Sequence, residues 1–129
     1  MIAHVLTTDG LALVDLDDET VIALESDQPF EPAPTPAVSL PLVVAAAAAG
    51  STIVAVVGTK PPIVVSHDAG ATWRESGRGL PAGRAVAISD DDPDVVLYAT
   101  RNRLYLSRDG GRFWRSLALE LPEIEAVAL

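Results

Sequence analysis

The side chains of this 129-residue chain that could do chemistry are chiefly its basic and acidic ones. Arginine binds carboxylates and phosphates through paired N–H donors, and lysine binds them as a point charge. Acidic runs, DDDPD at 90–94 and DLDDE at 15–19, offer the hard oxygen ligands that calcium takes. The chain has no cysteine, which excludes disulfides, thiolate metal sites and a cysteine nucleophile.

Neither acidic run has the alternating ligand and glycine spacing of an EF-hand loop, so solvated acidic turns are favoured over calcium sites. The two histidines, His4 and His67, are isolated and do not define a metal site. We therefore expect no metal and no cofactor. The net charge of −9 argues against nonspecific binding to nucleic acid or to anionic membranes, which requires clustered cations.

The elements that must position these side chains are short strands, because each apolar run is rich in Val, Ile, Leu and Tyr and is bounded by turn residues. Four such runs follow one another at 42–50, 51–58, 62–66 and 71–76, and four more repeat the order at 84–89, 95–100, 103–107 and 113–119. The alanine run at 45–49 favours a helix by propensity, but the interval between Pro41 and Gly50 is short for a helix. The repeat predicts a strand there.

The first third of the chain is a degenerate copy of the same unit. Residues 4–24 align without a gap over residues 97–117, which places Leu11 and Leu13 on Leu104 and Leu106. Residues 26–41 contain five prolines and are interpreted as an extended loop between units rather than a domain linker. The C-terminal residues 123–129 resemble the first strand of a unit that is not continued.

An eight-residue motif, Ser-x-Asp-x-Gly-x-Thr-Trp, occurs in both complete units at the turn between the third and fourth strands. Serine and aspartate oxygens accept hydrogen bonds from backbone N–H groups inside a tight turn, and glycine allows a positive φ. Tryptophan brings a large apolar area to the following strand. The motif residues are Ser66, Asp68, Gly70, Thr72 and Trp73 in the first copy, and Ser107, Asp109, Gly111 and Trp114 in the second, where Phe113 replaces threonine.

This motif is the Asp-box, and the chain resembles the Asp-box (BNR) repeat family of β-propellers, which includes sialidases, sortilin-type receptors and a photosystem assembly factor. The resemblance implies a structural role for the motif, away from the ligand site. It predicts an all-β fold of four-stranded antiparallel blades in one domain. Blade 1 would comprise residues 1–41 with an inner strand from 123–129, blade 2 residues 42–83, and blade 3 residues 84–122.

Three blades are too few to close a ring, because propellers usually have about four to eight. We expect a homodimer in which the strand from Ile124 to Leu129 completes the partner's first blade, giving a six-bladed ring with twofold symmetry. The alternative is a fragment of a larger receptor or assembly-factor propeller. The chain has neither a recognisable signal peptide nor a long apolar segment, and a cytoplasmic location with no membrane contact is expected.

Ligands of propellers usually bind on the face opposite the Asp-box turns. On that face the expected loops carry a possible ligand rim formed by Lys60, Arg78, Arg84, Arg101 and Arg103. Nearby acidic residues could instead pair with these cations and leave a solvated, mixed-charge rim. We expect no catalytic residue and a non-catalytic binding or scaffold function, with either a small molecule or a protein as ligand. The alternative is a glycosidase-like, sialidase-type hydrolase.

Overall fold

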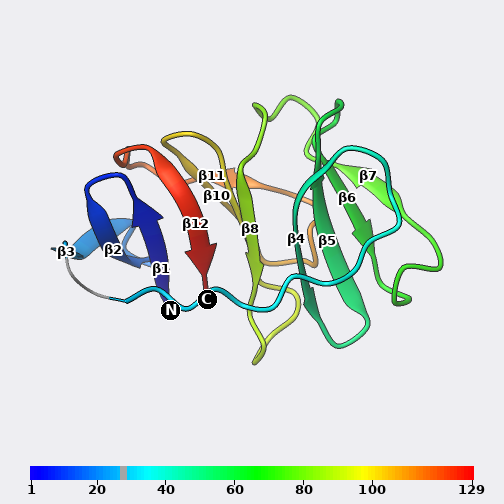
Figure 1. Cartoon of the computed structure of the whole chain (residues 1–129), viewed down its shortest axis with the longest axis horizontal. Coiled ribbons are helices and arrows are strands. Elements are labelled where there is room, and N and C mark those ends of the chain that lie inside the picture. Colours follow the sequence, from blue (N-terminus) through cyan, green and yellow to red (C-terminus); the bar gives the residue numbers. More distant parts are fainter. Residues whose placement is uncertain (27–28) are drawn as a thin grey trace.

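The computed structural model describes residues 1–26 and 29–129, so positions 27 and 28 of the proline-rich loop lie outside the described residues. Every regular element within these ranges is a β-strand, and the strands form three four-stranded antiparallel sheets (Figure 1). The expected all-β class with blade-like units of four strands is confirmed. None of the described residues forms a helix long and apolar enough to span a membrane.

Each sheet is named here as a blade, with its strands given from the inner to the outer edge. Blade 1 has the order β12 (Ile124–Ala128), β1 (Ile2–Thr7), β2 (Gly10–Asp15) and β3 (Thr20–Glu25). Blade 2 consists of β4 (Val43–Ala49), β5 (Thr52–Val57), β6 (Ile63–Ser66) and β7 (Arg74–Ser76). Blade 3 consists of β8 (Ala85–Ile88), β9 (Val96–Ala99), β10 (Leu104–Ser107) and β11 (Arg115–Ser116).

The alanine run forms strand β4, as the repeat predicts, although its helix propensity is high. It pairs along its length with β5, and Ala46 lies opposite Ala55. The outer strands β7 and β11 are shorter than the expected runs 71–76 and 113–119, so those boundaries were wrong. The physical reason is that the motif turns hold the backbone up to the tryptophan in a non-strand conformation.

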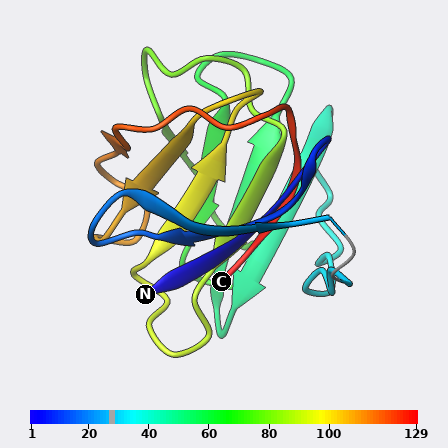
Figure 2. The same ribbon diagram turned by 90° about the vertical axis from the view of Figure 1, so that its left-hand side faces the viewer.

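The three blades form an arc with blade 3 in the middle, because β8 packs between β4 of blade 2 and β12 of blade 1 (Figures 1 and 2). The position in the arc explains the burial of the strands. Strands β8, β9 and β10 are buried at every position, as strands covered on both faces must be. Strands β1 and β4 at the ends of the arc show partly exposed positions along one face.

The C-terminal strand β12 pairs with β1 of its own chain, with His4 opposite Ala128 and Val5 opposite Val127. Blade 1 is thus assembled from both ends of the sequence. The connection between β3 and β4 must therefore span the arc, because it joins the blades at its opposite ends. Figure 1 shows this proline-rich segment crossing the molecule in cyan.

The packing between blades 2 and 3 generates a stability prediction at Gly83, which lies against the ring of Tyr98. A Cβ atom at position 83 would overlap the tyrosine ring, which is fully buried and cannot yield easily. We expect Gly83→Ala to lower the free energy of unfolding by about 2 kcal/mol in denaturant titrations. Gly58→Ala is the control, since a Cβ there would lie at an ordinary 3.6 Å from Leu42. Equal losses in the two variants would contradict this packing.

Candidate functional site

The first motif turn is held by two side chains that gather its backbone N–H groups. The Ser66 hydroxyl donates to Asp68 Oδ1 at 2.7 Å and accepts from the Gly70 N–H at 2.8 Å. Asp68 also accepts from the Thr72 backbone N–H at 2.9 Å and from the Thr72 hydroxyl. Gly70 has a φ of +92°, which favours glycine at this position. Every polar residue of the motif therefore shapes the turn.

The second turn repeats this arrangement with one loss. Ser107 donates to Asp109 Oδ1 at 2.7 Å and accepts from the Gly111 N–H at 2.9 Å, as in the first turn. Asp109 Oδ1 accepts from the backbone N–H groups of Arg112 and Phe113, both at 3.1 Å. Phe113 has no hydroxyl, so the bond that Thr72 gives to Asp68 has no counterpart here.

The two aspartates are consequently stabilised as carboxylates to different degrees. The Thr72 hydroxyl, followed by the Thr72 N–H and the Ser66 hydroxyl, lowers the pKa of Asp68 to about 2. For Asp109, burial opposes ionisation, but hydrogen bonds from Phe113, Ser107 and Arg112 outweigh it and lower its pKa as well. Both groups act as acceptors fixed in their charged form, which suits a structural role and not proton transfer.

The lowered pKa of Asp68 predicts a pH dependence of stability. Because the folded-state pKa lies below the ordinary value of 3.8, the carboxylate stabilises the fold above that value, and the contribution disappears as the pH falls through about 2. We expect Asp68→Asn to lower the melting temperature at neutral pH and to converge with the unmodified protein near pH 2. Asp91→Asn, at an exposed position of the acidic turn, is the control. A difference in melting temperature between Asp68→Asn and the unmodified protein that stays constant from about pH 6 to pH 2 would contradict the assignment. This range extends about two units either side of the ordinary pKa.

The junction between blades 2 and 3 is centred on an aromatic cluster. Tyr98 lies 5.9 Å from Trp114 and 6.0 Å from Tyr105 between ring centroids. The Trp114 Nε1–H donates to the Ser76 hydroxyl at 2.9 Å, and that hydroxyl donates to the Gly111 carbonyl. Ser76 belongs to β7 of blade 2, so this pair of bonds ties the outer edges of the two blades together.

The buried Ser76 hydroxyl gives a second stability prediction. Replacing it with alanine would leave the Trp114 Nε1–H and the Gly111 carbonyl without their partner, at a cost of about 2 kcal/mol in the free energy of unfolding. Ser116→Ala removes an exposed hydroxyl and should change stability by less than about 0.5 kcal/mol. Denaturant titration of both variants checks the difference. Similar values for both would contradict the proposed tie between blades.

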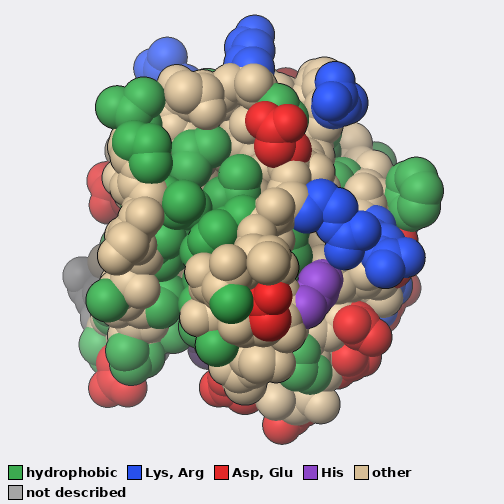
Figure 3. Space-filling view, turned by 90° about the vertical axis from the view of Figure 1, so that its right-hand side faces the viewer, with side chains coloured by type: hydrophobic (Ala, Val, Ile, Leu, Met, Phe, Trp, Pro, Cys, Tyr) green, Lys and Arg blue, Asp and Glu red, His purple; other side chains and the backbone are tan. Residues whose placement is uncertain are grey.

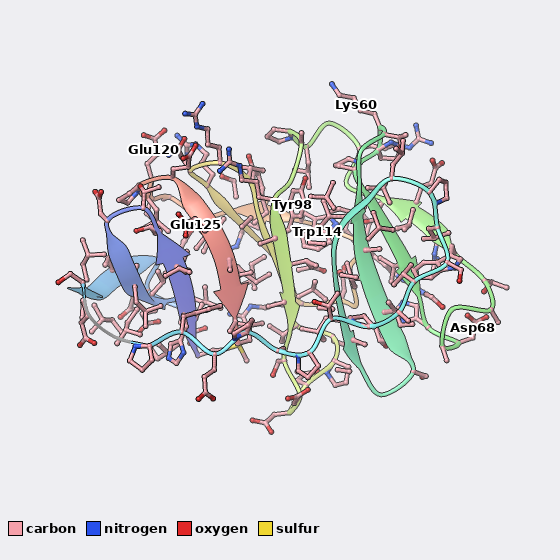
Figure 4. All side chains as sticks on the ribbon, in the orientation of Figure 1. Lys60, Asp68, Tyr98, Trp114, Glu120 and Glu125 are labelled. Carbon is pink, nitrogen blue, oxygen red and sulfur yellow. The ribbon has the colours of Figure 1, made fainter. Side chains whose placement is uncertain are left out.

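The five residues of the predicted rim do not share one environment, since Arg78 borders the same groove as His67 of the first motif turn. Figure 4 shows Lys60 and Glu120 at the upper edge, whereas Asp68 lies lower, at the right-hand end of the molecule. Three of the five rim cations are in ion pairs: Arg84 and Arg101 with Glu123, at 3.2 and 3.0 Å, and Arg103 with Glu120 at 2.9 Å. For Lys60 and Arg78, no carboxylate partner occurs among the described residues.

The acidic and histidine residues are not gathered into one cluster, although His67 and Asp94 both lie near Gly110. In the DDDPD turn, Asp92 Oδ1 accepts from the Asp94 N–H at 3.1 Å, and Asp94 provides a carbonyl for the Gly110 N–H. His67 Nδ1 lies 3.3 Å from the Thr52 hydroxyl, and His4 is exposed on β1 at the end of the arc. Within residues 1–26 and 29–129, no three His, Asp or Glu side chains are gathered as a metal site would require.

The structure contains a large hollow that the sequence analysis missed. It is a groove of about 590 Å³ between the outer parts of blades 2 and 3. Its lining includes Arg78 from the predicted rim and Trp114 from the motif, together with His67, Arg74, Arg112 and Phe113. The alignment of the repeats contains a signal for this groove, because it places Arg112 at the position that an acidic residue, Glu19, occupies in blade 1.

The fold and its repeated turns define this protein as an all-β repeat protein with propeller-like blades. Among solved structures, the chain is similar to the GH74 enzyme of Niastella koreensis, with 23% identity and a TM-score of 0.50. The similarity covers 93% of this chain but 18% of that enzyme, and it concerns the fold. No protein-family model matches the chain, and no curated protein matches it.

Proposed function

We propose that this chain is a non-catalytic Asp-box β-propeller protein that serves in binding or as a scaffold. The observation that carries the proposal is that both motif aspartates and three of the five predicted rim cations are engaged in structural contacts. Asp68 and Asp109 hold turns as acceptors, Arg84 and Arg101 share Glu123, and Arg103 pairs with Glu120. The absence of cysteine from the sequence fits the cytoplasmic location that belongs to this proposal.

The chain's two tyrosines weigh against the sialidase-type alternative, whose chemistry requires a tyrosine nucleophile. The Tyr98 hydroxyl donates to the Pro81 carbonyl at 2.6 Å, and burial, followed by the nearby Tyr105, raises the pKa of Tyr98 to about 12. Tyr105 is 9% exposed and packs in the same core. Neither side chain is available as a nucleophile.

The direct test of this function is an activity assay with a fluorogenic sialoside and a fluorogenic β-glucoside. We expect no release of the fluorophore above that in buffer without protein. Release by the unmodified protein that disappears in Tyr98→Phe would contradict the proposal and favour the hydrolase.

The second part of the proposal is that two copies of the chain close into a six-bladed ring. Blade 3 is covered on one face by blade 2 and on the other by blade 1, whereas each end blade lacks one neighbour. The uncovered faces are apolar: Ile2 on blade 1 is 41% exposed, and Val44 on blade 2 is 55% exposed. A twofold axis would bring the uncovered face of blade 1 against that of blade 2 in the partner, twice.

The long connection between β3 and β4 favours a dimer with exchanged strands. In the single chain it must cross from one end of the arc to the other, because β12 pairs with β1. If β12 paired instead with β1 of the partner, the same hydrogen bonds would form, and the connection would join adjacent blades as in other parts of the chain. Exchange of an identical element is a low-cost route to a dimer.

A pair of engineered cysteines tests the exchange, since the sequence contains no cysteine of its own. In the double variant His4→Cys/Ala128→Cys, the two thiols lie directly opposite each other on β1 and β12. We expect oxidation to give a covalent dimer on a non-reducing gel, because the paired strands would come from different chains.

The matched control is Ala48→Cys/Ile53→Cys, which places the thiols opposite each other on β4 and β5 of one blade. This pair should form its disulfide within one chain in either arrangement. A cross-link between positions 4 and 128 that also stays within one chain would contradict the strand exchange.

A further inference from the structure

The groove between blades 2 and 3 concentrates the unpaired positive charge of an acidic protein. The chain has nine Lys and Arg residues, and five arginines form ion pairs with carboxylates: Arg84, Arg101, Arg103, Arg108 and Arg115. Three of the other four line this one groove, and none has a carboxylate partner within the described residues: Arg74, Arg78 and Arg112. Figure 3 shows Lys and Arg side chains grouped beside a histidine at this end of the molecule.

The other junction in the chain, between blades 3 and 1, shows how such a groove is normally closed. Arg115 of blade 3 pairs with Glu19 of blade 1 at 3.1 Å, and Glu19 also accepts from the Ala118 N–H at 2.9 Å. Beside it, Arg108 pairs with Asp17 at 2.8 Å. Two carboxylates of one blade thus neutralise two arginines of the next.

The repeat makes the two junctions directly comparable. The spacing of 41 residues between the motif copies places Arg74 and His67 of blade 2 where blade 3 has Arg115 and Arg108. The alignment of residues 4–24 over 97–117 places Gly110 and Arg112 of blade 3 where blade 1 has the two carboxylates. At the groove, therefore, both carboxylates are missing and one is replaced by a further arginine.

The remaining acidic groups near the groove do not replace them. Glu75 of β7 also borders the groove, but alternation along the strand places it on the opposite face from Arg74 and Ser76, and it forms no ion pair with an arginine among the described residues. Asp94 lies near Gly110, at the His67 side of the groove. Two guanidinium groups that border one hollow and are in no ion pair repel each other, and a carboxylate placed between them would accept hydrogen bonds from both.

The groove also offers an apolar contact next to its charges. Phe113 is 78% exposed, the largest exposure among the large apolar side chains described, and it borders both the groove and a neighbouring hollow of about 300 Å³. Trp114 is held in place below it by its bond to Ser76. An exposed aromatic ring beside arginines is the surface that an acidic segment with apolar side chains complements.

We propose that this groove binds an acidic, extended segment of a partner protein. One carboxylate of the segment would lie between Arg74 and Arg112, as Glu19 lies against Arg115 at the other junction, and an apolar side chain would cover Phe113. The outer strand β7 has a free edge along which an extended segment can lie. The site is formed within one chain, so it does not depend on ring closure.

The test is fluorescence anisotropy with a fluorescein-labelled peptide, Glu-Phe-Glu-Glu-Phe-Glu, and the matching peptide with glutamine in place of glutamate. We expect the glutamate peptide to bind at least about ten-fold more tightly than the glutamine peptide at low ionic strength, and to lose this advantage near 0.5 M salt, where charges are screened within about 4 Å. Equal binding of the two peptides would overturn the proposal.

Two charge reversals localise the site. Arg112→Glu recreates the acidic residue of the other junction, so we expect peptide affinity to fall at least about ten-fold while the melting temperature is maintained or raised. Lys60→Glu makes the same change of charge on the predicted rim and should alter affinity by less than about two-fold. An equal loss in both variants, or none in Arg112→Glu, would overturn the assignment.

A competition with inorganic phosphate separates a peptide site from a site for small anions. We expect roughly millimolar phosphate to leave the bound peptide in place, because exposed charges are only weakly screened at that concentration. Complete displacement of the peptide by millimolar phosphate would assign the groove to a small anion instead. The oligomeric mass in solution should be the same for Arg112→Glu and the unmodified chain. Failure of the peptide-binding proposal is therefore distinguishable from failure of the proposed ring.

Discussion

The structure depends on one constraint: a four-stranded sheet with apolar side chains on both faces needs a neighbouring sheet on each side. Blade 3 satisfies this constraint within the chain, and its strands β8, β9 and β10 are buried throughout. Blades 1 and 2 satisfy it on one face only. The exposed apolar side chains at the ends of the arc, Ile2 and Val44 among them, follow from the number of blades and not from poor packing.

The contacts between blades differ in a way that separates structure from recognition. The junction between blades 2 and 3 is packed by Tyr98 in its core and tied by Ser76 and Trp114 toward its outer side, and the side-chain polar atoms of all three are partnered. At its outer edge the charges are unmatched, whereas the junction between blades 3 and 1 is closed by Glu19 and Asp17. Since the same repeat built both edges, the unmatched one is the place where we propose that the chain binds another molecule.

Much of the fold could be predicted from the sequence, because strand length, turn residues and repetition are local signals. The alanine run was assigned to a strand against its propensity because the repeat constrained it. The expected lengths of β7 and β11 were too long, because the hydrogen bonds of Asp68 and Asp109 extend the turns into the residues that were expected to begin these strands. The groove was missed because it forms between residues of different blades, Arg74 and Arg112, whose proximity only the fold provides.

The central claim is that the arc is half of a ring, and the most direct measurement is its mass in solution. Light scattering on a sizing column, over a hundred-fold range of protein concentration chosen to span roughly nanomolar to micromolar dissociation constants, gives this mass without a standard. A constant mass of twice 13.5 kDa is the predicted result. A constant mass of 13.5 kDa would contradict the ring and leave the two apolar faces of the arc exposed to solvent.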